Sequence, residues 1–354
     1  MTPRQTPVRD TRPVAEETGT ASNRTVTIRD VAEAAGVSAT TVSHALSGRR
    51  VVAPATRAKV AAAVDRLGYR ANEAARSLRT GRLGILGLVF RPRDAVHGSL
   101  MGTEYHQRLA GAAATAALDR GLGLLHIPDP LGPEARRLPM DGCILVSPSG
   151  SDRLLGELIG RGLPLVSADP DPDHPELGWW VGRDDTGAIA EVLDHLDAAG
   201  ARDVVLLVGT DDNAWNRGSR LGFEAWLRDR PHVGTVVPLF EGTGAPGADE
   251  AVDELLRAGQ RPDAIIGSSG RFAAGAAAAA RRHGLATPGD VMLVALSDSE
   301  VARGHDPQIT ALELHPERIA RAAVALLVDR LDGHDQPPPR VFTPTLKVRA
   351  STTR

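Results

Sequence analysis

Small and polar side chains gather near the N-terminus, in the stretch from Ser38 to Leu46. On a helix, Ala39, Thr40, Ser43 and His44 of this stretch share an outer face, because residues three and four apart are neighbours. Short side chains with hydroxyl or imidazole groups can exchange hydrogen bonds with base edges in the major groove of DNA. The spacing therefore predicts a helix that reads DNA bases, and the alternative is an ordinary helical scaffold.

Two short helical patterns and a tight turn would hold this face in place. Thr27-Ile28-Arg29-Asp30 has the S/T-x-x-D/E pattern of a capping box, which opens a helix over residues 28–35 that ends at Gly36. Ser38 then caps a second helix over residues 39–46. Two helices joined by a glycine turn form a helix-turn-helix, a motif that can place its second helix in the major groove.

A third helical pattern completes this segment. It begins at Pro54, a residue favoured in the first turn of a helix, and ends at Gly68. We expect the three helices to bury their apolar side chains against one another: Val31, Val42, Ala45 and Leu46 from the first two, and Val60, Val64 and Leu67 from the third.

Basic residues concentrate around these helices. Residues 24–82 contain eleven Arg and Lys against four acidic residues, a net charge of +7, although the whole chain of 354 residues carries −3. Residues 1–23 are neutral in sum, so residues 83–354 carry −10. A basic segment on an acidic chain attracts a polyanion. Together with the capping box and the glycine turn, the charge favours DNA as the partner of this segment.

Two further segments flank the helices. Residues 1–23 are rich in Thr, Pro, Arg and Glu without a periodic apolar pattern, which predicts a disordered arm. Downstream, Asn72 can cap a short helix over residues 73–79, and so short a helix needs a partner copy or DNA in order to form. We therefore expect a disordered arm at 1–23, a DNA-binding domain at 24–71 and a hinge helix at 72–82.

From Gly84 onward, apolar runs alternate with helical patterns. Eight runs are typical of strands, at 85–90, 123–127, 142–146, 163–167, 204–209, 235–239, 264–267 and 291–296. This alternation predicts an α/β fold of parallel sheets with helices on both faces. Because so many strands exceed one compact sheet, we predict two lobes over residues 83–354 that bind a ligand and dimerise.

Other candidate chemistry is weaker. Gly242 to Gly247 satisfies G-x-G-x-x-G after a strand pattern and before a helix, so a nucleotide-dependent enzyme is one alternative, although the motif lies late in the chain. Asp171 to Glu176 gathers possible metal ligands between prolines, which is more typical of a solvated loop. The single cysteine, Cys143, excludes an intramolecular disulfide and a cysteine-built metal site. We expect no catalytic residues, no metal and no cofactor.

No segment is typical of export or of membrane insertion. The longest alanine-rich apolar run, Phe272 to Ala280, has nine residues, whereas a membrane span needs about 20. The N-terminus lacks the apolar region of a secretory signal. We therefore expect a cytoplasmic protein without membrane contact. A second alternative is a cytoplasmic solute-sensing protein without DNA activity.

The helix-turn-helix segment resembles the LacI/GalR family of transcription regulators. The resemblance rests on Thr27 to Ser38, Thr41 to Leu46, Gly68 to Asn72 and Ala75 to Arg79, and continues at 164–169, 184–188, 219–223, 262–266 and 307–312. It implies a sequence-specific transcriptional repressor controlled by a small-molecule effector. The implied fold is a helix-turn-helix head and a two-lobed domain similar to periplasmic sugar-binding proteins.

The resemblance also implies a homodimer on a pseudo-palindromic operator of double-stranded DNA. It assigns DNA contacts to Ser38, Ala39, Thr40, Thr41, Ser43, His44, Arg50, Leu78 and Arg79. Leu78 matches the family's leucine wedge, which opens a base step in the minor groove and kinks the DNA. Arg79 would lie in the same narrowed groove. The alternative role of Leu78 is that of a helix-core leucine.

In the two-lobed domain, the resemblance implies three crossings of the chain between the lobes, near residues 183, 312 and 335. Ligands of such folds bind beyond the carboxyl ends of the strands, which points to Asp169, Arg220, Ser269 and Ser297. Family members often have Asp where Gly270 stands here, and many sugar-responsive members have Asp where Ser297 stands. Because serine makes a weaker, neutral hydrogen bond to a sugar hydroxyl, the effector class stays open between a sugar and a nucleoside.

Overall fold

The computed structural model describes residues 26–47, 50–69, 81–91, 104–127, 138–150, 153–174, 176–228 and 230–353. The chain divides into two compact units, Met1–Thr80 and Gly81–Arg354. The predicted arm at 1–23 and the predicted hinge helix at 73–79, with Leu78 and Arg79, lie outside the described residues.

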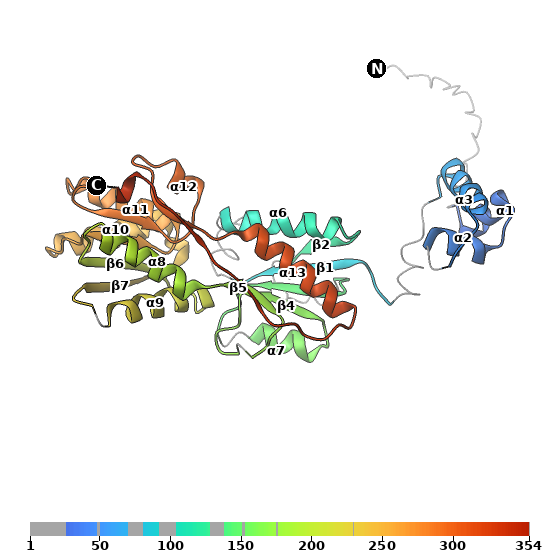
Figure 1. Ribbon diagram of the computed structural model, residues 1–354, viewed down its shortest axis with the longest axis horizontal. Helices are drawn as coiled ribbons and strands as arrows, with labels where there is room; N and C mark the ends of the chain where they lie inside the picture. Colours follow the sequence, from blue (N-terminus) through green and yellow to red (C-terminus); the bar gives the residue numbers. More distant parts are fainter. Residues whose placement is uncertain are drawn as a thin grey trace, which may run out of the picture. The chain divides into compact units, whose positions relative to one another are not determined.

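The described residues of the first unit form three helices, as predicted: α1 (Ile28–Ala35), α2 (Ala39–Ser47) and α3 (Pro54–Leu67) (Figure 1). The capping box is present, since Thr27 Oγ1 accepts a hydrogen bond from Asp30 N (3.4 Å) and Asp30 Oδ2 accepts one from Thr27 N (2.7 Å). Gly36 ends α1 in the left-handed conformation, at φ 65°, which glycine adopts without steric cost. Ser38 Oγ accepts a hydrogen bond from Thr41 N (3.0 Å) and caps α2.

The apolar core of this unit is small. Its fully buried members are Val31, Ala32, Val42, Val60 and Ala63, and Ala45, Val64 and Leu67 pack against them. The prediction for Leu46 is wrong, because this side chain is 47% exposed. One residue along a helix turns the side chain by about 100°, so Leu46 points away from the core that Ala45 contacts.

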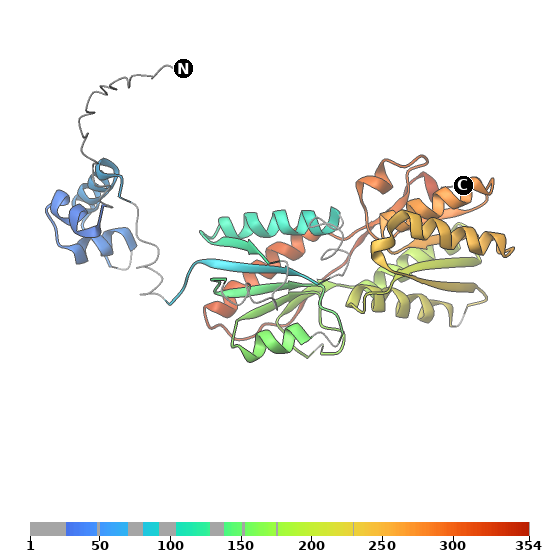
Figure 2. The same cartoon turned by 180° about the vertical axis from the view of Figure 1, so that it is seen from behind.

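The second unit contains two α/β lobes (Figures 1 and 2). Lobe 1 has a parallel six-stranded sheet in the order β11-β5-β4-β3-β1-β2. Its strands are β1 (Ile85–Phe90), β2 (Gly123–His126), β3 (Gly142–Val146), β4 (Leu165–Ala168), β5 (Trp180–Arg183) and β11 (Arg340–Phe342). One face is covered by α6 (Glu104–Leu118) and α13 (Pro316–Leu331), which lie side by side, and the other by α7 (Arg153–Gly160).

Lobe 2 has a six-stranded sheet in the order β12-β10-β9-β8-β6-β7, in which only β12 is antiparallel to its neighbour. Its strands are β6 (Asp203–Gly209), β7 (Val233–Leu239), β8 (Ala264–Gly267), β9 (Met292–Ala295), β10 (Thr310–Glu313) and β12 (Thr345–Lys347). Its helices and 3-10 turns are α8 (Asp185–Ala198), α9 (Ala214–Leu227), η2 (Glu241–Thr243), α10 (Gly244–Arg257), α11 (Gly270–Arg282), α12 (Glu300–Arg303) and η3 (Ala350–Thr352).

Side chains alternate between the two faces of each sheet. In β3, Ile144 and Val146 face α6 and α13, whereas Cys143 and Leu145 face α7. The side of lobe 1 under α6 and α13 and the side of lobe 2 under α8 and α9 belong to one continuous apolar core. Within the described ranges, no helix has the length and apolar character needed to cross a membrane.

The structure contains the eight predicted strands and four that the sequence did not indicate: β5, β10, β11 and β12. These four lie where the chain passes between the lobes, after Arg183, Glu313 and Phe342. The first two crossings agree with the predicted positions near 183 and 312, and the third lies beyond the predicted position near 335. Some of the predicted strands are equally short but are largely apolar runs, whereas each of the four missed strands contains a charged residue. Thr310–Glu313 is also built mostly of helix-favouring residues.

The glycine motif at 242–247 forms η2 and the first turn of α10. A Cβ on Gly247 would lie 2.2 Å from Thr243 Oγ1, and one on Gly275 of α11 would lie 2.2 Å from the Ala245 carbonyl oxygen. These glycines therefore allow the close turn and the close approach of α10 to α11, which gives the motif a structural explanation.

Candidate DNA-reading helix and effector cavity

The predicted DNA-reading face lies on α2 and beside it. Ser38, Thr40 and Arg50 are exposed, and Thr41, Ser43 and His44 are partly exposed. Ala39 is partly buried because it packs against the core of the three-helix unit. The hydroxyls of Ser38 and Thr41 lie 2.8 Å apart, and Ser38 also caps the helix, so these two side chains organise its N-terminus. Backbone N–H groups at a helix N-terminus attract phosphate.

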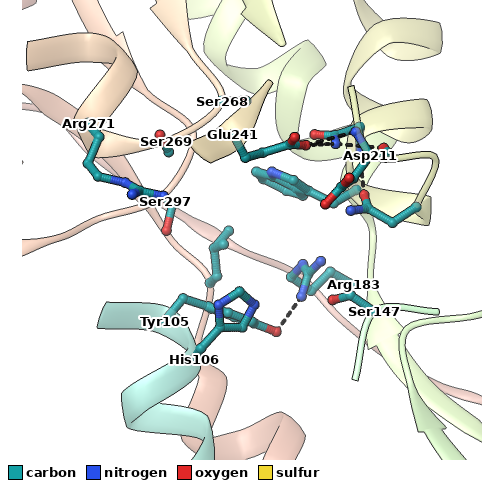
Figure 3. A pocket seen from close by; sticks show the side chains of 14 residues that line it. Tyr105, His106, Ser147, Arg183, Asp211, Glu241, Ser268, Ser269, Arg271 and Ser297 are labelled. Atoms are coloured by element: carbon teal, nitrogen blue, oxygen red, sulfur yellow. Dashed lines mark hydrogen bonds between the residues drawn. The ribbon is translucent and has the colours of Figure 1, made fainter. Parts of the chain in front are cut away.

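A cavity of about 650 Å³, including its open mouth, lies between the two lobes of the second unit (Figure 3). Lobe 1 contributes Tyr105, His106, Ser147 and Arg183. Lobe 2 contributes Asp211, Asn213, Trp215, Asn216, Glu241, Ser268, Ser269, Arg271 and Ser297, and Leu314 lies at the second crossing. A cavity between two lobes, with aromatic and polar walls, suits a small organic ligand.

Arg183 is a buried cation in the wall of this cavity, with a side chain that is 3% exposed. Its Nε donates to Asp185 Oδ1 (3.1 Å), Nη1 to the Tyr105 hydroxyl (2.6 Å) and Nη2 to Asp169 Oδ2 (3.2 Å). The guanidinium carbon also lies 5.0 Å from the centre of the Trp215 ring. Arg183 therefore contacts both lobes at the first crossing of the chain.

Burial and charge shift the pKa values around Arg183. Burial raises the pKa of Asp185 to about 6, although the Arg183 charge opposes this rise. Burial also raises the pKa of Tyr105, so its phenol stays a hydrogen-bond donor or acceptor without charge. For Arg183 itself, burial lowers the pKa, but Asp169, Tyr105 and Asp185 outweigh burial and raise it, so the guanidinium stays charged.

Ser147 and Asp169 follow β3 and β4 in an uncommon backbone conformation, with φ of 49° and 81°. Asp169 is 1% exposed, and its Oδ2 accepts hydrogen bonds from Ser147 Oγ (3.0 Å) and from Arg183. Backbone strain of this kind concentrates at functional sites. Asp169 stands behind the cavity wall and orients the two side chains that line it.

The lobe 2 side of the cavity carries a carboxylate network. Glu241 Oε1 accepts hydrogen bonds from Asp211 N (3.0 Å) and Asn216 Nδ2 (2.7 Å), and Asn216 Nδ2 also donates to the Asp211 carbonyl oxygen (2.8 Å). Burial raises the pKa of Glu241, and these hydrogen bonds oppose the rise. Glu241 Oε2 is buried and has no hydrogen-bond partner among the described residues.

Ser269 and Ser297 line the cavity beside Arg271, after β8 and β9 (Figure 3). Ser269 also caps α11, since its Oγ accepts a hydrogen bond from Phe272 N (3.3 Å). A Cβ on Gly270 would lie 2.1 Å from Ser299 Oγ, so a side chain there would require the Ser299 hydroxyl to move.

Two family models match the chain. Residues 27–72 match the bacterial regulatory proteins of the lacI family, and residues 193–352 match a periplasmic binding protein-like domain. The chain is 31% identical over 345 residues to the HTH-type transcriptional regulator PtxS of Pseudomonas putida, covering 92% of this chain and 96% of PtxS. The chain belongs to the lacI family of bacterial regulatory proteins.

Solved structures share the fold of this lacI-family chain. The complex of the transcriptional regulator CelR with cellobiose matches with a TM-score of 0.68 at 25% identity, covering 92% of this chain and 99% of CelR. The Lac repressor dimer bound to operator and the anti-inducer ONPF matches with a TM-score of 0.77 at 22% identity, covering 94% of this chain and 100% of that chain. The predicted family and fold are confirmed: the protein is a DNA-binding transcriptional regulator with a helix-turn-helix and a periplasmic-binding-protein-like domain.

The predicted effector residues of this lacI-family chain have different places. Ser269 and Ser297 line the cavity. Asp169 lies behind the lining and accepts a hydrogen bond from the lining residue Arg183. Arg220 departs from the prediction, because its side chain is 60% exposed and its Nε donates to Glu224 Oε1 (2.8 Å) on the same helix.

Helix geometry explains the misplacement of Arg220. The inward face of α9 carries Asn216 and the fully buried Ser219. One residue further along, the side chain of Arg220 is turned by about 100°. The prediction that Arg220 lies by the cavity is therefore wrong.

The sequence did not indicate several of the lining residues, above all Arg183, Trp215 and Glu241. Arg183 ends β5, Trp215 lies in the first turn of α9, and Glu241 begins η2 after β7, directly before the glycine motif. Because ligands of parallel α/β folds bind at the carboxyl ends of strands, polar and aromatic residues at these junctions were the available signal.

Proposed function

We propose that this lacI-family chain is a transcriptional repressor that binds a pseudo-palindromic operator as a homodimer. Its affinity for the operator changes when a small polyhydroxylated effector occupies the cavity between the lobes. The observation that carries this proposal is the presence, in one chain, of a helix-turn-helix with an exposed polar face and of a polar cavity lined by both lobes. The Lac repressor structure, a dimer on its operator, supports the assembly.

The walls of the cavity favour a carbohydrate as the effector. Serine and carboxylate oxygens accept hydrogen bonds from hydroxyl groups, and the N–H groups of Arg183 that its three protein bonds leave over can donate them. The Trp215 ring offers an aromatic face to the apolar face of a sugar ring. The cellobiose bound to CelR supports this class. A nucleoside is the other class of effector that a ligand screen can identify.

We assign DNA contact to the segment 24–71 and to a hinge at 72–82, following an arm at 1–23 and preceding an effector and dimerisation domain at 83–354. Thr40, Ser43 and His44 would read base edges, with Arg50 close by, and Leu78 and Arg79 would enter the minor groove. The chain acts as a regulator and not as an enzyme, and a DNA-binding protein of this kind works in the cytoplasm of a bacterium.

Effector binding would act through the angle between the lobes. The chain passes between the lobes three times, so closure of one lobe on the other bends all three connections together. A ligand that binds more tightly at one angle between the lobes increases the fraction of molecules with that angle. The spacing of the two heads in the dimer then changes, and the hinge helices either meet on DNA or separate.

Measurements of operator binding and DNA bending test the DNA-binding part. Selection from a random DNA pool should return a pseudo-palindromic site, and Thr40→Ala and His44→Ala should each weaken binding to it by about tenfold, as lost base contacts do. Leu78→Ala should reduce the DNA bend. Affinity should fall steeply with salt, because the basic head displaces counterions from phosphates. A flat salt titration would contradict DNA binding.

Ligand screening tests the effector part. The fluorescence anisotropy of a labelled operator is measured with the full chain while neutral sugars, nucleosides or NAD are added. A change with a sugar supports the proposal. A response to nucleosides alone would replace the carbohydrate, and a response to NAD alone would favour the nucleotide-dependent alternative at Gly242–Gly247.

A further inference from the structure

We propose that Glu241 forms a subsite that selects hydrogen-bond donors, so that the cavity takes neutral or cationic polyhydroxylated ligands and rejects carboxylated or phosphorylated ones. The inference rests on the proposed function of the cavity and names the class of effector more narrowly. Glu241 Oε2 accepts the donors, from a pair of hydroxyl groups or from an ammonium group of the ligand.

The first argument is the rigid placement of the carboxylate. Glu241 Oε1 is held by Asp211 N (3.0 Å) and Asn216 Nδ2 (2.7 Å), which fixes the plane of the group. The last residue of β6, Gly209, leaves room for it: a Cβ there would lie 2.0 Å from Glu241 Oε1 and 2.6 Å from Asn216 Nδ2. The Asp211 backbone N–H and the Asn216 side chain therefore hold one oxygen of this carboxylate in place.

The second argument is the state of the other oxygen. Glu241 Oε2 is buried, belongs to a residue that lines the cavity, and has no hydrogen-bond partner among the described residues. A buried acceptor without a donor is unfavourable, and such groups in native proteins usually serve a ligand or water. A ligand that brings a donor removes this penalty, whereas a ligand that brings another anion increases it.

The third argument is the charge of the cavity. Its charged lining residues among those described are Arg183, Arg271, Asp211 and Glu241. Arg183 already pairs with two buried carboxylates behind it, Asp169 and Asp185. An incoming carboxylate or phosphate would therefore meet more negative than positive charge, and in a partly buried site this repulsion is poorly screened.

The experiment has two arms on the full chain. In the first, the thermal stability of ligand-free Glu241→Gln is compared with the unchanged protein and with Glu224→Gln, an exposed carboxylate on the same lobe. Glutamine keeps the acceptor oxygen for Asp211 and Asn216 but removes the buried charge. We expect Tm to stay or to rise by about 2–4 °C for Glu241→Gln, and no change for the control. A fall in Tm of that size would mean that the charge serves the fold, which overturns the subsite.

In the second arm, isothermal titration compares D-glucose, D-glucosamine and D-glucuronate, which share a ring and differ in charge, together with cellobiose and cellobiuronate. We expect the carboxylated member of each set to bind at least about tenfold more weakly than its neutral counterpart, and Glu241→Gln to reduce this gap. Equal or tighter binding of the carboxylates overturns the inference. If no sugar binds, the proposed carbohydrate effector fails, and the first arm still decides whether Glu241 serves the fold or the cavity.

Discussion

Arg183 joins two carboxylates and one phenol in a single buried group. The side chains of Arg183, Asp169 and Asp185 are 3%, 1% and 8% exposed. Removing three polar groups from water is unfavourable, and their mutual hydrogen bonds offset that penalty only while all members are present. Two members of the group, Arg183 and Tyr105, also line the cavity at the first crossing. Arg183 therefore contributes to stability, to the cavity wall and to the geometry of the lobes.

Replacement of Arg183 should be severely destabilising. Arg183→Ala leaves Asp169 and Asp185 buried without a cation, and breaking a buried pair in this way costs about 3–5 kcal/mol. Urea denaturation of the full chain measures the free energy of unfolding. Arg220→Ala is the matched control, because the exposed pair with Glu224 should contribute less than about 1 kcal/mol. Similar effects of the two substitutions would contradict the buried network.

Asp185 should make stability depend on pH. Its pKa is raised to about 6 by burial, above the ordinary value of 3.8, so the folded chain binds a proton more readily than the unfolded chain between these values. The contribution of this group to stability is therefore present below about pH 4 and is lost as the pH rises through 6.

Other carboxylates titrate in the same pH range, so the test compares two proteins that differ only at residue 185. The free energy of unfolding is measured from pH 4 to 7 for the unchanged chain and for Asp185→Asn. The difference in unfolding free energy, variant minus unchanged chain, should increase in favour of Asp185→Asn as the pH rises toward 7. A constant difference across this range would show that Asp185 does not titrate there.

At the scale of secondary structure, the close contact of α8 with α9 positions the cavity wall. Gly222 of α9 faces α8, and a Cβ there would lie 2.3 Å from Ile189 Cγ2 and 3.1 Å from the Thr186 carbonyl oxygen. Because Trp215 and Asn216 begin the same helix, any shift of α9 moves two lining residues.

Gly222→Ala should therefore destabilise the chain by about 1–3 kcal/mol, as overpacking of a close contact does. Gly111→Ala is the matched control: this exposed glycine lies within α6, and a methyl group there would meet nothing within 4 Å. At this position the alanine should stabilise by about 0.5–1 kcal/mol. Chemical denaturation measures both, and effects of the same sign would contradict the packing described.

At the scale of the whole second unit, ion pairs join the lobes beside the cavity. Arg217 of α9 binds Asp173, which follows β4, with Nη1 and Oδ1 2.8 Å apart. From α6, Glu104 binds Arg303 (2.8 Å) and Arg108 binds Glu313 (3.0 Å). These pairs favour the arrangement of the lobes seen in this structure, although a single partly exposed pair contributes little alone.

Removal of two of these pairs should favour lobe opening. Asp173→Asn combined with Glu104→Gln should lower the effector affinity by up to about tenfold at low salt, and the effect should shrink at high salt because such pairs are screened. Energy transfer between dyes on the two lobes measures opening directly. Glu157→Gln, which removes a partly exposed pair with Arg161 at the end of α7, should change neither quantity. Unchanged energy transfer in the double variant would contradict a role in closure.

The local elements of this protein could be predicted from its sequence. The Thr27–Asp30 capping box, the Gly36 turn and the apolar runs of eight strands depend on residues within a few positions of one another, so they do not require knowledge of the fold. The helix-turn-helix and the +7 charge around it likewise lie within one short segment, and they indicated DNA without knowledge of the fold.

The set of side chains that share the cavity, in contrast, depends on the tertiary structure. Glu241, Asn216 and Arg183 lie in separate segments that meet because sheet order and the lobe crossings bring the ends of their strands together. A single residue of helix rotation separates Ser219, buried in α9, from Arg220 on its surface. No local pattern carries that information, since it depends on which face of the helix another part of the chain covers.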